Sequence, residues 1–325
     1  MKLLEISDYQ KLNESFQKRL VYHLGIDCGF FVELNYMINA ILYCLANGYR
    51  FLLYSEDANF GTGKGWTEYF QPFCEEVHEP FHHKYNLRRQ SIWRRILAHW
   101  LAFKTYGEYV RLSQDVAHEP DKFYHIPALD ISCSYTEAYA MLARMIWQPQ
   151  PEVQQKMKDA RHRLSLPEIY SGVQIWEGNN ATGSRLISGW QIIQALHPQD
   201  GECIFVLADN YQQLEIVRNE FQKLRIVSLC QPHETGYHHQ AFEHLSPQEK
   251  KESIIRLLIS VDILLQCCAF VGTITSGPSV FLLKVRADDP CVTAIDCPQD
   301  MLPDCLTLNI DERAAISRRF VVRLT

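Results

Sequence analysis

The sequence lacks a Cys-x-x-Cys pair, although it contains eleven cysteines. Cysteines paired at that spacing are typical of zinc sites and redox motifs, and small secreted proteins carry an even number in disulfides. Cys44, Cys203, Cys267 and Cys268 lie instead in apolar runs, where a thiol behaves as a small hydrophobic side chain. The cysteines therefore predict a reduced, cytoplasmic chain with neither a disulfide framework nor a zinc site.

A long hydrophobic run and an excess of positive charge are also missing. No apolar stretch is expected to span a bilayer, and Met1 to Lys11 is too polar for a signal peptide. The 38 acidic and 32 basic residues give a formal net charge of -6. This balance argues against a general nucleic-acid or membrane-surface binder. The basic pairs Arg88-Arg89 and Arg94-Arg95 are interpreted as solvated helix faces.

What the chain does have is enough apolar material for a large core. Its 325 residues are 47% hydrophobic and 22% charged, which is typical of a globular protein with two domains. The first part predicts a β-α-β unit, with strands at 20–26 and 50–54 around a helix at 31–46 that Gly48 ends. A further helix is expected over about 91–106. Its apolar face would be formed by Ile92, Ile96, Leu97, Trp100, Leu101 and Phe103.

The run Gln148-Pro149-Gln150-Pro151 ends a helix predicted over 135–147, because proline cannot continue a helix. We therefore expect one α/β domain over 1–148 and a second over 149–325. In the second, strands at 172–175, 203–208, 226–229, 269–271 and 292–295 alternate with helices, and another short strand is expected near 306–310. This alternation predicts a doubly wound parallel sheet.

Polar residues follow three of these strands, at 176–185, 209–210 and 273–279. Ligands of open α/β sheets bind beyond the carboxyl ends of the strands, so the three segments predict one site. Backbone N–H groups at helix starts and the Thr and Ser hydroxyls suit a diphosphate. The simpler interpretation of Asp209 is a helix N-cap.

Two other patterns are weaker. The loop Gly61-Thr62-Gly63-Lys64-Gly65 lacks the glycine spacing and the hydroxyl residue of a phosphate-binding P-loop. The pair His82-His83, with His78 nearby, could suggest a metal ion, but paired histidines in a loop are more often solvated. The histidines of 233–244 do not form the H-E-x-x-H pattern of a metal-dependent hydrolase, and structural histidines are the simpler interpretation there. No metal site is predicted.

Four stretches then occur in a telling order: Asp27-Cys28-Gly29-Phe30, 65–72, 145–151 and Gly172-Val173-Gln174-Ile175. Together they resemble the α1,6-fucosyltransferase superfamily, which includes the animal enzyme of the N-glycan core and the rhizobial nodulation-factor enzyme. The resemblance implies two open, Rossmann-like α/β domains of the glycosyltransferase B type. The N-terminal domain would lie on the acceptor side, and the C-terminal domain would bind a nucleotide-sugar, possibly GDP-fucose, without a metal ion.

The resemblance and the strand ends together assign the candidate site residues. The expected contacts of the nucleotide-sugar are Gln174, Trp176, Gly178, Asn179, Asp209, Asn210, His238, Asp262, Thr273, Thr275 and Ser276. For His238, a purely structural role is the alternative interpretation. Asp262 stands two residues from Ser260, onto which the guanine-binding aspartate of the family falls.

The chain departs from the family where the chemistry is concentrated. Trp176 stands in place of the catalytic arginine, Glu177 in place of the next arginine, and Gln174 in place of the histidine that helps hold guanine. A departing diphosphate needs a positive partner, and arginine grips phosphate with two hydrogen bonds. Arg185 is the candidate replacement. Glu177 is the candidate general base, with a solvated surface carboxylate as an equal alternative.

Two functions follow. The first is transfer of a sugar from a nucleotide-sugar to a glycan or another hydroxyl acceptor by an inverting displacement. The second is a non-catalytic relative that binds a glycan, a nucleotide or a protein, and the missing arginines favour it. Retained glycine- and hydroxyl-rich strand ends favour the first.

Overall fold

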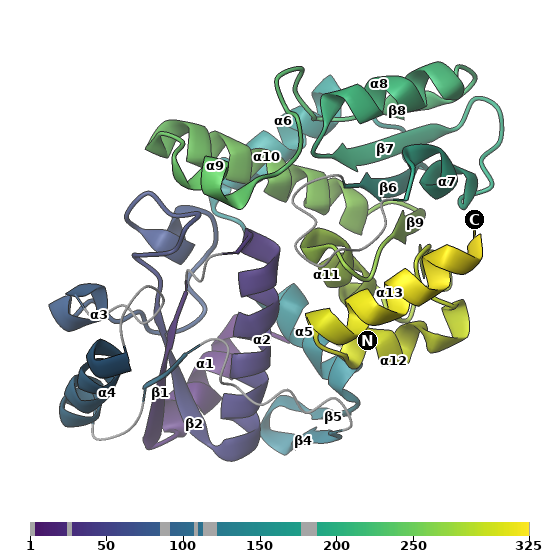
Figure 1. Ribbon diagram of the computed structural model, residues 1–325. Coiled ribbons are helices and arrows are strands. Elements are labelled where there is room, and N and C mark those ends of the chain that lie inside the picture. Colours follow the sequence, from purple (N-terminus) through teal and green to yellow (C-terminus); the bar gives the residue numbers. More distant parts are fainter. Residues whose placement is uncertain are drawn as a thin grey trace. The chain divides into compact units, whose positions relative to one another are not determined.

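The computed structural model describes residues 4–24, 28–84, 92–106, 110–112, 122–176 and 187–324 (Figure 1). The chain forms two compact units. Unit 1 consists of Met1–Pro151 and Leu245–Lys251, and unit 2 consists of Glu152–His244 and Glu252–Thr325. The division after Pro151 lies at the end of the proline-containing segment where the sequence predicts a boundary. Leu245–Lys251 groups with unit 1, whereas the sequence predicts that it belongs to the second domain.

Unit 1 is built on a parallel sheet of three strands in the order β2-β1-β3. Its first elements are α1 (Ile6–Ser15), β1 (Lys18–His23), α2 (Phe30–Asn47) and β2 (Tyr49–Tyr54). Gly48 ends α2 in the left-handed conformation, with φ of 68°, as its position after the periodic run predicts. The chain then turns directly into β2, which pairs with β1 along its whole length.

The rest of unit 1 is more irregular. Its elements are η1 (Gly65–Glu68), α3 (Pro80–Lys84), α4 (Ile92–Tyr106), β3 (Val110–Leu112), β4 (Tyr124–Ile126), η2 (Pro127–Leu129), β5 (Ile131–Cys133) and α5 (Tyr135–Ile146). Strands β4 and β5 form an antiparallel pair. A capping box between Ser134 and Glu137 starts α5.

By length and composition alone α2 could cross a membrane, contrary to the expectation from the sequence. Its 18 residues have a mean hydropathy of 1.2, but 61% of that window is buried. The helix packs on β2 and α5, and both Met37 and Ile38 are inaccessible to solvent. These contacts are typical of the core helix of a globular domain.

Unit 2 contains five parallel strands in the order β10-β9-β6-β7-β8. Its first half comprises α6 (Pro151–Arg163), β6 (Ser171–Ile175), α7 (Gly189–Gln194), β7 (Cys203–Ala208), α8 (Tyr211–Glu220) and β8 (Arg225–Val227). Its second half comprises α9 (His239–Glu243), α10 (Pro247–Leu265), β9 (Ala269–Gly272), α11 (Gly277–Val285), β10 (Val292–Ala294), η3 (Gln299–Met301), α12 (Leu302–Thr307) and α13 (Ile310–Leu324). The doubly wound sheet predicted from the sequence is present.

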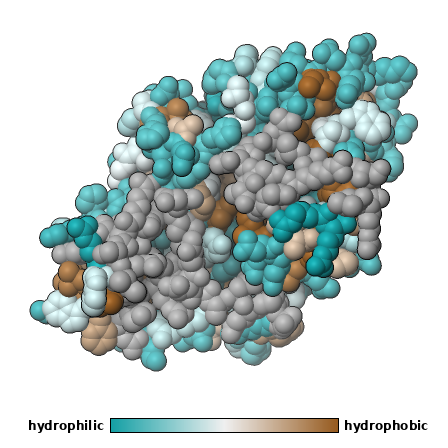
Figure 2. All heavy atoms as spheres, in the orientation of Figure 1, coloured by the Kyte–Doolittle hydropathy of each residue, from teal (hydrophilic) through white to brown (hydrophobic). Residues whose placement is uncertain are grey.

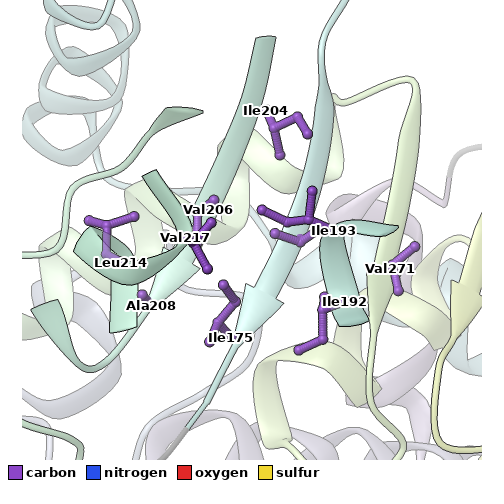
Figure 3. Packing of buried hydrophobic residues seen from close by; sticks show 10 residues of the cluster. Ile175, Ile192, Ile193, Ile204, Val206, Ala208, Leu214, Val217 and Val271 are labelled. Atoms are coloured by element: carbon purple, nitrogen blue, oxygen red, sulfur yellow. The ribbon is translucent and has the colours of Figure 1, made fainter. Parts of the chain in front are cut away.

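Alternate residues of β6 face opposite layers of unit 2. Val173 and Ile175 pack with Ile192 and Ile193 of α7 and with side chains of α8 (Figure 3). Gly172 lies against α10, since a Cβ there would stand 2.3 Å from Leu264 Cδ2. The period of two along the strand thus places helices on both faces of the sheet.

The C-terminal tail differs from the prediction. The strand expected near 306–310 is wrong, because α12 and α13 occupy this part of the chain. Apolar residues alternate there, which is typical of a strand, but local caps select helices. Asn309 Oδ1 accepts the N–H groups of Asp311 and Glu312 at 3.0 Å each, and the Glu312 carboxylate accepts the Asn309 N–H.

Candidate functional site

The order of the strands in unit 2 creates a switch point between β6 and β9. From β6 the chain moves outward to β7 and β8, then returns to the other side of β6 to form β9 and continues to β10. Connections leave the two adjacent strands in opposite directions, and in open α/β sheets ligands bind in the crevice outside the carboxyl ends of the strands at such a switch point. Trp176 follows β6 at this edge, and the registers bring it level with Asp209 after β7 and the residues after Thr273.

Gln174 is a buried polar group at this edge, and both ends of its amide are hydrogen-bonded within unit 2. Its amide Nε2 donates to Ser276 Oγ at 2.6 Å, and its Oε1 accepts from Ser279 Oγ at 2.5 Å. The side chain is 5% exposed. Gln174, expected to contact the nucleotide, therefore braces the first turn of α11 against β6.

The N-terminus of α11 lies at this edge without a side-chain cap. Ser276 is its N-cap residue, its side chain makes no capping hydrogen bond, and the first turn has no acidic residue. Pro278 has no N–H, so Gly277 and Ser279 contribute the unpaired donors of this turn. By contrast, Ser188 caps α7 and Asn210 caps α8. Such a helix start favours an anion.

Asp296, two residues beyond β10, fixes the loop between β9 and α11. Its carboxylate accepts the Ile274 N–H at 2.8 Å and lies 3.5 Å from the Thr275 hydroxyl. Burial raises the pKa of this carboxyl to about 6, against the lowering effect of the same hydrogen bonds. Sequence reasoning missed Asp296, although a polar residue after a predicted strand is the signal used for Asp209.

On the other side of β6, Asp209 and Asn210 hold loops. Asp209 Oδ2 accepts the Tyr237 N–H at 3.0 Å, and Asn210 Oδ1 accepts the Gln212 N–H at 2.9 Å. The N-cap of α8 is therefore Asn210 and not its neighbour. His238 occupies the N-cap position of α9 without a capping hydrogen bond. These residues shape the edge, and Asp209 remains partly exposed there.

A guanidinium that sequence reasoning did not consider also reaches this side. Arg256 of α10 donates to Glu234 at 2.6 Å, and the Glu234 carbonyl accepts the N–H of Tyr211, which starts α8. Arg256 is one of several charged residues on a helix, so nothing in the sequence distinguishes it. Only the fold brings it to the loop beside Asp209.

Asp262 is not brought to this edge. Tyr170, directly before β6, donates from its hydroxyl to the carbonyl of Ile263 at 2.8 Å. Asp262 is next to Ile263, in the last turn of α10 before the chain enters β9, and so it lies near the amino ends of the strands. Glu177, Gly178, Asn179 and Arg185 lie outside the described residues.

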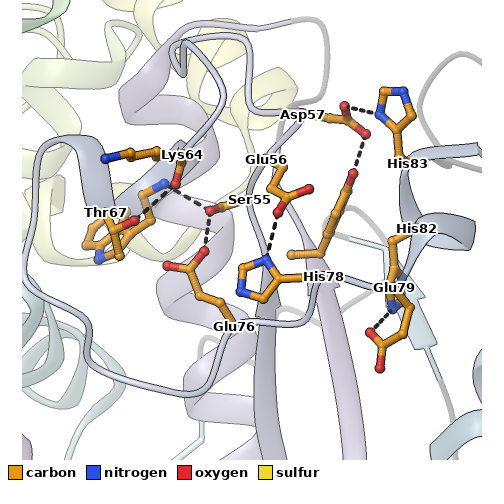
Figure 4. Close-up of polar contacts among 12 residues, drawn as sticks. Ser55, Glu56, Asp57, Lys64, Thr67, Glu76, His78, Glu79, His82 and His83 are labelled. Atoms are coloured by element: carbon orange, nitrogen blue, oxygen red, sulfur yellow. Dashed lines mark hydrogen bonds and ion pairs between the residues drawn. The ribbon is translucent and has the colours of Figure 1, made fainter.

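Unit 1 has its own polar edge, where β1 and β2 end (Figure 4). His83 Nδ1 lies 2.8 Å from Asp57, and His78 Nδ1 lies 2.7 Å from Glu56. His82, which is buried, hydrogen-bonds to His23 at 2.9 Å, and burial lowers the pKa of its imidazole to about 4. No group of three potential ligands for a metal ion occurs among the residues that the structure describes.

In unit 1, the Glu68 side chain hydrogen-bonds to the backbone of the glycine-rich loop. The Glu68 carboxylate accepts the N–H groups of Thr62 and Lys64 at 2.6 and 2.8 Å. Gly65 has φ of 59°, and a Cβ there would lie 2.1 Å from the Ser55 carbonyl oxygen. The N–H groups of Thr62 and Lys64 are therefore not free to bind a phosphate.

Solved structures share the fold of this chain. NodZ α1,6-fucosyltransferase soaked with GDP-fucose aligns with a TM-score of 0.52 and 11% identity, over 82% of this chain and 92% of its own. An Arabidopsis thaliana FUT1 mutant in complex with GDP aligns with a TM-score of 0.51 and 12% identity, over 86% of this chain and 73% of its own. The chain has a fucosyltransferase fold.

This fucosyltransferase fold is of the glycosyltransferase B type, as the four ordered stretches of sequence imply. No protein-family model matches the chain, and no curated protein matches it either. At 11% and 12% identity the likeness concerns the fold and leaves the residues of the site to be judged on their own geometry.

Proposed function

We propose that this protein is a glycosyltransferase that takes a sugar from a nucleotide-sugar, GDP-fucose being the leading candidate, and transfers it to a hydroxyl of a glycan or similar acceptor. The observation that carries the proposal is the uncapped N-terminus of α11 at the β6–β9 switch point. In a fucosyltransferase fold, this helix start favours an anion, and the partly exposed Trp176 follows the neighbouring strand β6.

In this proposal the N–H groups of Gly277 and Ser279 and the hydroxyls of Thr273 and Thr275 bind the diphosphate. Trp176 stacks on the base or the sugar ring. Gln174, Ser276 and Asp296 do not touch the donor and instead hold the first turn of α11 in place. Their assignment as positioning residues replaces the direct contacts expected of Gln174 and Ser276.

The reaction would be a single displacement without a metal ion. The acceptor oxygen forms a bond to the anomeric carbon while the bond from that carbon to the diphosphate oxygen breaks, and the electron pair leaves with the nucleoside diphosphate. Glu177 would take the proton of the acceptor hydroxyl, and Arg185 would offset the charge on the diphosphate. Both belong to the segment that follows Trp176.

One observation favours the alternative, a relative that binds without transfer. Trp176 stands where the family has its catalytic arginine, and the Gln174 amide is already occupied by two serines. A tryptophan offers no charge to a leaving diphosphate. Under this alternative the same crevice binds a nucleotide or a glycan, and no sugar is transferred.

Calorimetric titration of the purified chain with GDP, GDP-fucose, UDP and ADP tests the proposal. We expect binding of GDP and GDP-fucose, weakened by Thr273→Val but not by the control Thr307→Val, whose hydroxyl donates to the Asp304 carbonyl of its own helix. Arg185→Ala should weaken binding, whereas Arg218→Ala, which removes a surface ion pair with Glu215, should not. Binding of none of the four nucleotides would overturn the donor site.

An assay of sugar turnover distinguishes the transferase from the non-catalytic relative. Release of free fucose or its transfer to an oligosaccharide mixture, abolished by Glu177→Gln with GDP binding intact, is expected for the transferase. GDP binding with neither product, at high enzyme concentration, would support the non-catalytic alternative.

A further inference from the structure

Helix α4 of unit 1 presents its apolar face outward. Trp93, Ile96, Trp100 and Phe103 are 77%, 53%, 54% and 54% exposed, and Leu97 is 39% exposed. These positions recur at spacings of three, four and seven, so they form one stripe along the helix. Hydrophobic side chains gather over α4 in Figure 2, next to hydrophilic ones.

The opposite side of α4 is the one that unit 1 buries. Ala102 is inaccessible to solvent and packs in a cluster with Val21, Leu52 and Tyr54. Two residues along a helix rotate the side chain by about 200°, so Ala102 lies across the helix from Trp100. The small residue faces the sheet and the aromatic residues do not. Ile96, Leu97, Trp100 and Phe103, which belong to the apolar face predicted from the sequence, are therefore exposed and not part of the core.

The charges of α4 indicate what could cover this face. From residue 92 to residue 106 the sequence contains Arg94, Arg95 and Lys104 and no acidic residue, in a chain whose net charge is -6. Lys104 Nζ lies 5.4 Å from the centroid of the Trp100 ring. A second copy of the chain would bring the same cations against these. An anionic surface complements them. The net charge of the whole chain argues against a general membrane-surface binder, but the charge of this helix has the opposite sign.

We propose that α4 docks on an anionic lipid bilayer. Trp93, Trp100 and Phe103 enter the boundary between headgroups and acyl chains, and Lys104 remains among the lipid phosphates. Helices that lie in a membrane interface combine an apolar stripe containing Trp and Phe with Lys and Arg beside it. The inference goes beyond sugar transfer and does not depend on it.

Flotation of the full chain with lipid vesicles tests this directly. Vesicles of equal parts phosphatidylglycerol and phosphatidylcholine should carry the protein upward, and pure phosphatidylcholine vesicles should carry much less. Raised salt should weaken the binding, because it screens the attraction between exposed charges. Absence of binding to the anionic vesicles would overturn the proposal and leave a protein as the occupant of this face.

Matched variants distinguish vesicle binding through the α4 stripe from nonspecific binding by other exposed hydrophobic side chains. Ile96→Ala with Trp100→Ala should reduce vesicle binding about tenfold or more, because each side chain loses apolar area in the interface. The control pair, Trp190→Ala with Ile216→Ala, removes an exposed Trp and an exposed Ile from helices of unit 2 and should leave binding unchanged. Equal loss in both pairs would contradict the proposal.

The charge is tested in the same way. Lys104→Glu should weaken binding to anionic vesicles, and Lys158→Glu, an exposed lysine of α6, should have little effect. Light scattering completes the test. A dimer that disappears in the Ile96→Ala, Trp100→Ala variant would show that a second copy covers the stripe, and the lipid proposal would then fail.

Discussion

Gln174 and Ser276 hydrogen-bond to each other over 2.6 Å, from the central strand of unit 2 to the N-cap of α11. Ser279, one turn into the helix, donates to the same glutamine. The Gln174 side chain thus links strand β6 to the first turn of α11. It holds the helix start at which we place the diphosphate.

Replacing Gln174 by leucine should destabilise unit 2 by about 1–3 kcal/mol, because two buried serine hydroxyls lose their partner. Urea unfolding measures the loss. A double-mutant cycle with Ser279→Ala provides the control, since removing both partners should cost less than the sum of the single changes. Strict additivity would show that the two side chains do not interact.

Gly272→Ala should disturb the candidate site itself. A Cβ at Gly272 would lie 2.4 Å from Ser279 Oγ and 2.8 Å from the Phe270 ring, so these side chains have to move and the hydrogen bond between Ser279 and Gln174 is disturbed. We expect a loss of about 1–3 kcal/mol in stability together with weaker GDP binding.

Gly172→Ala is the control for Gly272→Ala. Its Cβ meets Leu264 at 2.3 Å, at the start of β6 and away from the site. This variant should lose stability but, well below its melting temperature, keep its affinity for GDP. Unchanged GDP affinity in Gly272→Ala as well would separate α11 from nucleotide binding.

Asp296 should make the stability of unit 2 depend on pH. Its pKa is raised from 3.8 to about 6, so the folded state binds the proton more tightly than the unfolded state. The stability of the wild type relative to Asp296→Asn should therefore rise by up to about 3 kcal/mol as the pH falls from 7 to below 4. Urea unfolding at several pH values measures it. A constant difference would contradict the raised pKa.

Protonation of His82 should lower the stability of unit 1, whereas protonation of Asp296 should raise the stability of unit 2. Its pKa is lowered from 6.5 to about 4, so protonation favours the unfolded state. Stability that is present above pH 6.5 should be lost as the pH falls toward 4, and His82→Gln should remove that dependence. His83→Gln is the control, because His83 is exposed. NMR titration of the imidazole checks the pKa directly, and a value near 6.5 would refute the prediction.

The sequence predicts the elements well where local signals agree. Apolar spacing along 31–46 with Gly48 after it predicts α2, and short apolar runs ending in polar residues predict β6, β7 and β9. Alternation of strands and helices then leaves a parallel, doubly wound sheet as the simplest arrangement. The prediction failed near 306–310, where the cap that Asn309 and Glu312 form at the start of α13 outweighs a short alternating pattern.

By itself, the sequence determined the kinds of element, their order, and the strand ends at which a ligand site could form, because these depend on residues close together in the chain. Only the tertiary structure decided what each polar residue does there. Gln174 meets Ser276 across 102 positions, and Asp262 is carried to the other end of the sheet. The tertiary structure also decided that the apolar stripe of α4 is exposed. Which side of a helix is buried depends on the sheet against which the helix packs.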